Sequence, residues 1–122
     1  NDKDLVFIQS INRFIEAHLG NNDYVIEDLA VEMGMSRSVF FKKVKGLTGL
    51  APVEYVRDVL MQHAAVLLLQ EDYTIKEISY MVGMNDAKYF SRCFKNKYQM
   101  TPTEYRRMNI SPIQATKEYD LE

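Results

Sequence analysis

Apolar residues recur at helical spacing along most of this chain, and we therefore expect an all-α fold. The first stretch predicts an amphipathic helix whose wide apolar face is formed by Phe7, Ile8, Ile11, Phe14, Ile15 and Leu19. A longer helix is expected over residues 52–70, because Pro52 suits a first helical turn and apolar positions continue to Leu68.

The same pattern of residues occurs twice, with a period of roughly fifty residues. The segment LAVEMGMSRSVFFKKVKGLTGLAPVEYVR, from Leu29, aligns with ISYMVGMNDAKYFSRCFKNKYQMTPTEYRR, from Ile78, with one residue inserted in the second copy after Gly83. The matched pairs include Gly34 with Gly83, Met35 with Met84, Phe40 with Phe90, Lys42 with Arg92, Lys45 with Lys95 and Tyr55 with Tyr105. One small structure is therefore expected to be built twice.

Each copy is expected to be a helix, a short turn and a second helix. In the second copy, Thr74 and Glu77 form a capping box that opens a helix over residues 75–82, and Gly83 ends it. Either Asn85 or Asp86 then caps a helix that runs to about Tyr98.

In the first copy, a helix from Ile26 ends at Gly34, and Ser36 caps a second helix to about Gly46. Two helices joined by a short glycine-containing turn are typical of a helix-turn-helix unit. Helix hairpins of an ordinary bundle share these features, so the spacing alone leaves that alternative open.

The predicted domain covers residues 1–108, and we expect residues 109–122 to form a loosely ordered tail. Within the domain we expect a first helix-turn-helix unit at 26–47, a linker helix at 52–70, a second unit at 75–98 and a C-terminal helix at 102–108. The linker helix would be roughly 28 Å long, which is comparable with one turn of B-DNA at about 34 Å. It is therefore long enough to place two helices in successive major grooves.

The second helix of each unit combines an apolar face with a cationic face. Phe40, Val44 and Leu47 are expected to face the core in the first unit, as are Phe90 and Phe94 in the second. The opposite faces carry Ser38, Phe41, Lys42 and Lys45 in the first unit, and Lys88, Ser91, Arg92 and Lys95 in the second. A solvated surface helix usually mixes in glutamates as partners. Neither helix contains an acid once the capping position of the second one, at Asp86, is set aside. This absence of acids favours contact with phosphate.

The formal net charge of the 122 residues is −2, but the charges are unevenly distributed. Residues 33–53 contain four cations and no acid, and so do residues 87–103. Because the local field steers a polyanion, these two segments are the expected nucleic-acid-binding surface.

The apolar content of 47% is sufficient for the core of one domain. The single cysteine, Cys93, excludes an internal disulfide and a multi-cysteine zinc site, and we expect a buried thiol. The apolar run at 64–69 is too short to cross a bilayer, and no signal peptide is visible. The chain begins at Asn1, so we expect a fragment of a larger protein, and Leu121-Glu122 could be a cloning junction.

These motifs resemble the DNA-binding domain of the AraC/XylS family of bacterial transcription regulators. The resemblance extends from about Leu5 to Met108, and its most specific stretch is IKEISYMVGMNDAKYFSRCFKNKYQMTPTEYR. The run KKVKGLTG is similar to the hybrid two-component members of the family. The resemblance implies about seven helices in two homeodomain-like units, whose recognition helices enter adjacent major grooves for sequence-specific binding of double-stranded DNA.

The resemblance also implies roles for individual residues. The base-facing residues would be Arg37, Ser38, Phe41, Lys42, Lys88, Ser91 and Arg92, of which Arg37 is placed to reach either a base edge or the backbone. Arg92 is the strongest candidate for reading a base, since arginine grips guanine O6 and N7. The phosphate contacts would be Lys43, Lys45, Lys95 and Lys97. For Phe41, two orientations remain open: against thymine methyl groups, or back into the core.

The sequence departs from the family pattern at three further positions. Methionine at Met84 and glutamine at Gln99 stand where phenylalanine and glycine are frequent, and Ala51 is a poor helix cap before Pro52. We therefore expect the helix end at Gln99 to close differently from its glycine counterpart.

The family further implies a larger, signal-responsive parent, an activator in which phosphorylation of a receiver would control dimerisation through parts missing from this chain. RNA polymerase is an additional partner that the resemblance allows. The expected location is cytoplasmic, with a parent that could be anchored in the inner membrane, and we expect no membrane contact by this fragment.

We expect no enzymatic activity, cofactor, metal or small-molecule ligand in this domain. His18 and His63 are far apart and more typical of packing or surface residues, and Gly46-Leu47-Thr48-Gly49 lacks the lysine and spacing of a phosphate loop. The alternatives are a helical protein-interaction module that does not bind DNA, and a nucleic-acid repair domain with similar helix pairs.

Overall fold

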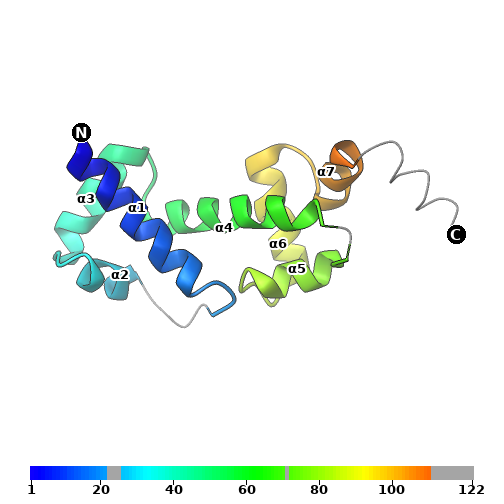
Figure 1. Ribbon diagram of the computed structural model, residues 1–122, viewed down its shortest axis with the longest axis horizontal. Helices are drawn as coiled ribbons and strands as arrows, with labels where there is room; N and C mark the ends of the chain where they lie inside the picture. Colours follow the sequence, from blue (N-terminus) through cyan, green and yellow to red (C-terminus); the bar gives the residue numbers. More distant parts are fainter. Residues whose placement is uncertain (22–25, 71, 111–122) are drawn as a thin grey trace, which may run out of the picture.

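The computed structural model describes residues 1–21, 26–70 and 72–110, and within these ranges the secondary structure is entirely helical (Figure 1). Seven helices are found there: α1 (Asp2–Ala17), α2 (Ile26–Glu32), α3 (Arg37–Thr48), α4 (Pro52–Leu68), α5 (Ile75–Met81), α6 (Ala87–Tyr98) and α7 (Pro102–Asn109). The all-α prediction is confirmed. The predicted tail lies outside the described residues from Ser111 onward, and Asn109 still belongs to α7.

Helix α4 joins two compact units that lie at its opposite ends (Figure 1). It contacts α1 and α3 in the first unit and α5, α6 and α7 in the second. The helix ends at Leu68, two residues before the predicted end at Gln70. Because both units pack on one continuous helix, their relative orientation is set by α4.

Local hydrogen bonds explain where the helices begin. The Ser36 hydroxyl accepts from the Val39 N–H at 3.3 Å and caps α3, and the Asp86 carboxylate accepts from the Lys88 N–H at 2.9 Å and caps α6. Reciprocal capping boxes open α5 at Thr74 and α7 at Thr101. At Ala51 the side chain provides no cap, but Glu54 accepts from the Ala51 N–H at 3.1 Å.

The two inter-helix turns have the same backbone geometry. Gly34 and Gly83 adopt φ of 69° and 84°, in the left-handed region that favours glycine. The next residue then bonds back into the preceding helix: the Met35 N–H donates to Ala30 O at 2.9 Å, and the Met84 N–H donates to Ser79 O at 2.8 Å. The repeat seen in the sequence is therefore a repeat in structure.

The core runs through both units along the buried side of α4. Phe40, Val44, Phe90 and Phe94 are all 1% exposed or less, as their helical spacing predicts. The prediction that Leu47 faces the core is wrong, because Leu47 is 41% exposed. It lies in the last turn of α3, and periodicity along a helix does not reveal how far the core beneath that helix extends.

Within the described residues, no helix has the length and apolar content needed to cross a membrane.

Candidate nucleic-acid interface

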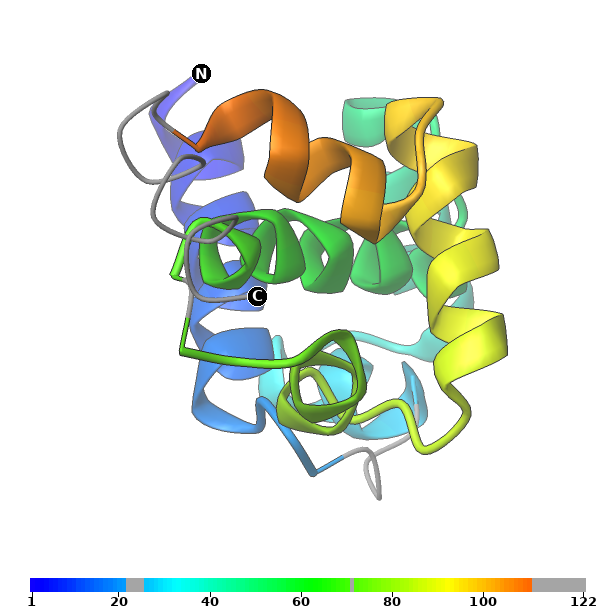
Figure 2. The ribbon, with the colours of Figure 1, turned by 90° about the vertical axis from the view of Figure 1, so that its right-hand side faces the viewer.

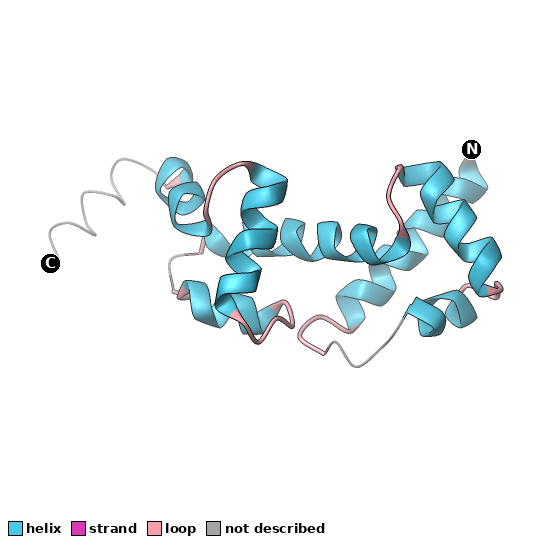
Figure 3. Ribbon diagram, turned by 180° about the vertical axis from the view of Figure 1, so that it is seen from behind, coloured by secondary structure: helices cyan, strands magenta, loops and turns pink. Residues whose placement is uncertain are grey.

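Helices α3 and α6 lie on the same face of the molecule. Figure 2 shows both on one side of α4, with α1 on the other, and Figure 3 shows that face from the front. Each is the second helix of its unit and packs against the first, α2 with α3 and α5 with α6. The two helices that the sequence singled out therefore present their outer surfaces in a common direction.

The outer surface of α3 carries the four base-facing candidates of the first unit. Arg37, Ser38, Phe41 and Lys42 are all exposed, and together they line an open hollow of about 390 Å³. The Phe41 side chain is 49% exposed, whereas that of the adjacent Phe40 is 1% exposed. Phe41 therefore points outward, and of the two orientations left open by the sequence, the one in the core is wrong.

Arg37 is held by an acid of the preceding helix. Its guanidinium Nη1 lies 2.9 Å from Oε1 of Glu27 on α2, and both side chains are at least half exposed. Exposed pairs of this kind contribute about 1 kcal/mol or less to stability, so the pair orients Arg37 more than it stabilises the fold. Sequence periodicity did not reveal this contact, because it joins two helices.

The outer surface of α6 carries three exposed cations. Lys88, Arg92 and Lys95 are exposed, while Ser91 is half-buried and less accessible than the sequence suggested. A cleft of about 340 Å³ separates this surface from α4, and Arg92 lies on its edge with Arg57 and Tyr89.

Arg57 and Tyr89 are functional candidates that the sequence analysis missed. A hydrogen bond with the Cys93 side chain, followed by partial burial, raises the pKa of the Tyr89 hydroxyl, while the nearby Arg57 guanidinium lowers it. Cys93 itself is buried, as expected for a structural thiol. The spacing of Glu54, Arg57, Asp58 and Met61 on one side of α4 was the signal that would have placed Arg57 beside α6.

The four predicted phosphate ligands have different environments. Lys45 and Lys95 are exposed on the recognition helices. The Lys43 ammonium lies 4.5 Å from the centre of the Phe7 ring on α1, in a cation–π contact. Lys97 forms an ion pair with Asp58 of α4 at 2.7 Å. The structure therefore leaves Lys45 and Lys95 the most accessible of the four.

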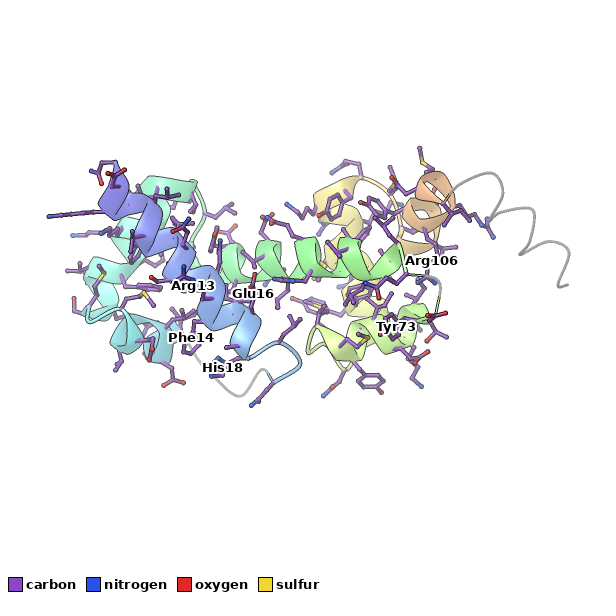
Figure 4. The ribbon with its side chains drawn as sticks, in the orientation of Figure 1. Arg13, Phe14, Glu16, His18, Tyr73 and Arg106 are labelled. Carbon is purple, nitrogen blue, oxygen red and sulfur yellow. The ribbon has the colours of Figure 1, made fainter. Side chains whose placement is uncertain are left out.

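Each unit is fixed to α4 by a different polar contact. In the first unit the Tyr55 hydroxyl donates to Asn12 Oδ1 at 2.7 Å, and burial raises the pKa of that hydroxyl. In the second, the Arg106 guanidinium on α7 donates to the carbonyls of Leu68, Gln70 and Tyr73 (Figure 4). These contacts join α1 to α4 in the first unit, and α7 to the end of α4 and the segment after it in the second.

Comparison with known proteins identifies this arrangement. A family model described as a helix-turn-helix domain matches residues 29–108. Over 94 residues the chain is 34% identical to histidine kinase P4 of Formosa agariphila. The aligned segment covers 77% of this chain and 7% of the kinase. The chain therefore spans only a small part of that relative.

Two solved structures are similar over most of their length. The C-terminal domain of AraT, a response regulator from Geobacillus stearothermophilus, superposes with a TM-score of 0.74 at 27% identity, over 86% of this chain and 87% of that one. The DNA-binding domain of AdpA, a global transcriptional factor solved in complex with a target DNA, superposes with a TM-score of 0.72 at 25% identity, over 84% of this chain and 90% of that one. The chain belongs to the AraC-type helix-turn-helix family, whose members bind specific DNA sequences in transcription regulation.

Proposed function

We propose that this chain binds double-stranded DNA by placing α3 and α6 in two successive major grooves on one side of the duplex. The observation that carries the proposal is the shared direction of two acid-free recognition helices, each with an exposed cationic surface. The 17 residues of α4 span about 26 Å, comparable with one B-DNA turn of about 34 Å.

We divide the interface into residues that read bases and residues that position the domain. The base-reading set is Arg37, Ser38, Phe41 and Lys42 on α3, with Lys88, Ser91 and Arg92 on α6. The phosphate-contacting set is Lys43, Lys45, Lys95 and Lys97, of which Lys97 would have to exchange Asp58 for a phosphate.

We further propose that the chain is the output domain of a larger regulator that responds to a signal. Two similar proteins, a histidine kinase and a response regulator, support a place in a phosphorelay. We place this parent in the cytoplasm or anchored in the inner membrane with the present domain in the cytoplasm. In such a parent, phosphorylation would control dimerisation and thereby activation of transcription by RNA polymerase.

The dependence of duplex affinity on salt tests this proposal. If three to four phosphates are neutralised by the phosphate-contacting set, depending on whether Lys97 leaves Asp58, the logarithm of the association constant falls with the logarithm of salt concentration with a slope of about −2.7 to −3.6. Titrations of a labelled duplex at several salt concentrations measure that slope. Lys45→Ala is expected to flatten it, whereas Lys3→Ala, on α1 and in neither proposed contact set, should leave it unchanged. A protein-interaction module would show no such slope.

A further inference from the structure

The two recognition helices differ at one pair of equivalent positions. Phe41 on α3 occupies the place of Ser91 on α6, as the aligned repeat shows. The ring of Phe41 is 49% exposed, and Ser91 is half-buried. The first unit therefore offers a large apolar group at a position where the second unit offers only a small hydroxyl.

The surroundings of Phe41 leave about half of its surface exposed. The hollow in which it lies is lined otherwise by Arg37, Ser38 and Lys42, which are polar. Arg37 is tied to Glu27 on α2, which directs its guanidinium toward that helix. The ring is thus an apolar spot within a cationic surface, which is the surface expected to meet the duplex.

The major groove contains one apolar group at a base edge, the C5-methyl of thymine. A charged phosphate would gain nothing from a phenyl ring, whereas a methyl group removed from water against it is stabilised. Phosphates are instead matched by the exposed lysines of the phosphate-contacting set, Lys45 on α3 and Lys95 on α6.

We infer that Phe41 reads the C5-methyl group of a pyrimidine in the major groove, so that the two units recognise different chemistry. The first unit selects a methylated pyrimidine edge through Phe41, and the second selects guanine through Arg92. The inference rests on the proposed function and names the base feature that the first unit reads.

Replacing thymine by deoxyuridine tests the inference, because only the methyl group is removed. A duplex selected from a random pool by this chain is used as the probe, and each thymine is changed in turn. At one thymine the affinity should fall about fourfold, the factor expected for one buried methyl-sized group. Replacing the pyrimidine there by cytosine and by 5-methylcytosine separates the methyl group from the rest of the base: 5-methylcytosine should bind more tightly than cytosine by a similar factor.

Phe41→Ser, which copies the residue of the second unit, provides the matched variant. Because Phe41 is exposed, this variant is expected to fold, and circular dichroism confirms that. It should bind the thymine and deoxyuridine duplexes equally. Equal binding of both duplexes by the parent, or an equal deoxyuridine penalty in the parent and Phe41→Ser, would overturn the inference. These comparisons are made on duplexes that the parent binds in a salt-dependent way. If the parent shows no salt-dependent duplex binding, the proposed function itself is wrong.

Discussion

The ammonium nitrogen of Lys97 lies 2.7 Å from Oδ1 of Asp58, which joins α6 to α4. The two side chains are 24% and 28% exposed, and the other carboxylate oxygen of Asp58 accepts from Gln62 Nε2 at 2.9 Å. Lys97 also lies over the Tyr98 ring, 5.3 Å from its centre. A cation that the sequence assigns to phosphate is therefore already engaged within the protein.

Asp58→Asn is predicted to strengthen duplex binding. The substitution removes an acid beside the recognition face and releases Lys97, so the salt slope should steepen by up to about 0.9 as one more phosphate is engaged. Titration of a labelled duplex at several salt concentrations measures the change. Asp2→Asn, which alters the net charge equally on α1, should have little effect. An unchanged slope in Asp58→Asn would mean that Lys97 does not approach phosphate.

Arg92→Ala and Lys45→Ala are predicted to weaken DNA binding in different ways. Loss of a bidentate guanine contact should cost about 1–3 kcal/mol on the selected duplex and relax selectivity at one base pair. Loss of Lys45 should weaken all duplexes alike and reduce the salt slope by about 0.9. Competition against scrambled duplexes separates the two effects. If both variants bind as the parent does, the recognition helices are assigned to the wrong face.

Local features of the fold were predictable from the sequence because short-range hydrogen bonds decide them. Ser36 and Thr74 cap helices as their spacing indicated, and the glycines at the two turns have the positive φ that such turns require. The repeat in the sequence also predicts that α3 and α6 occupy equivalent positions in their two units.

Contacts between helices were not predictable in the same way. Arg106 donates to three carbonyls at and just beyond the end of α4, but it aligns with Val56 in the first unit, so the repeat gave no hint of its role. The pairing of Arg37 with Glu27 and the exposure of Leu47 depend on how helices pack, which periodicity along one helix does not report.

Gln99→Gly is predicted to stabilise the domain. Gln99 ends α6 with φ of 62°, and within the described residues it is the one non-glycine residue with positive φ; Gly49 ends α3 equivalently at 79°. The helix end therefore closes as its glycine counterpart does, contrary to the sequence-based expectation. Relief of the left-handed strain, offset by the greater freedom of unfolded glycine, should add about 0.5–1 kcal/mol to the free energy of unfolding.

Urea denaturation measures this change, with Gly49→Gln as the reciprocal variant. A Cβ atom added at Gly49 would meet no atom within 4 Å, so the cost of the substitution there mainly reports backbone strain. If Gln99→Gly lowers the free energy of unfolding while Gly49→Gln leaves it unchanged, the left-handed backbone at these two helix ends does not carry the strain that we assign to it.

Arg106→Ala is predicted to destabilise the second unit. Its guanidinium donates to Leu68 O at 2.8 Å and to Tyr73 O at 2.7 Å, and truncation leaves carbonyls at the end of α4 without those donors. Hydrogen bonds from a charged group contribute about 1.5–3 kcal/mol, and the loss should be of that order. Arg106→Lys should recover only part of it, because an ammonium lacks the planar fork of donors.

Thermal unfolding measures that effect, with the exposed neighbour Arg107 as the control. Arg107→Ala should change the midpoint little. Equal effects of Arg106→Ala and Arg107→Ala would show that the three-carbonyl contact does not hold the second unit to α4.

Interference by guanine N7 methylation on the selected duplex tests the central claim most directly. Methyl groups at N7 block major-groove contacts, so a domain that inserts α3 and α6 together should give two clusters of interference. The account predicts clusters centred about 10 base pairs apart on one face of the duplex. A single cluster, or two clusters on opposite faces, would contradict simultaneous insertion of the two helices.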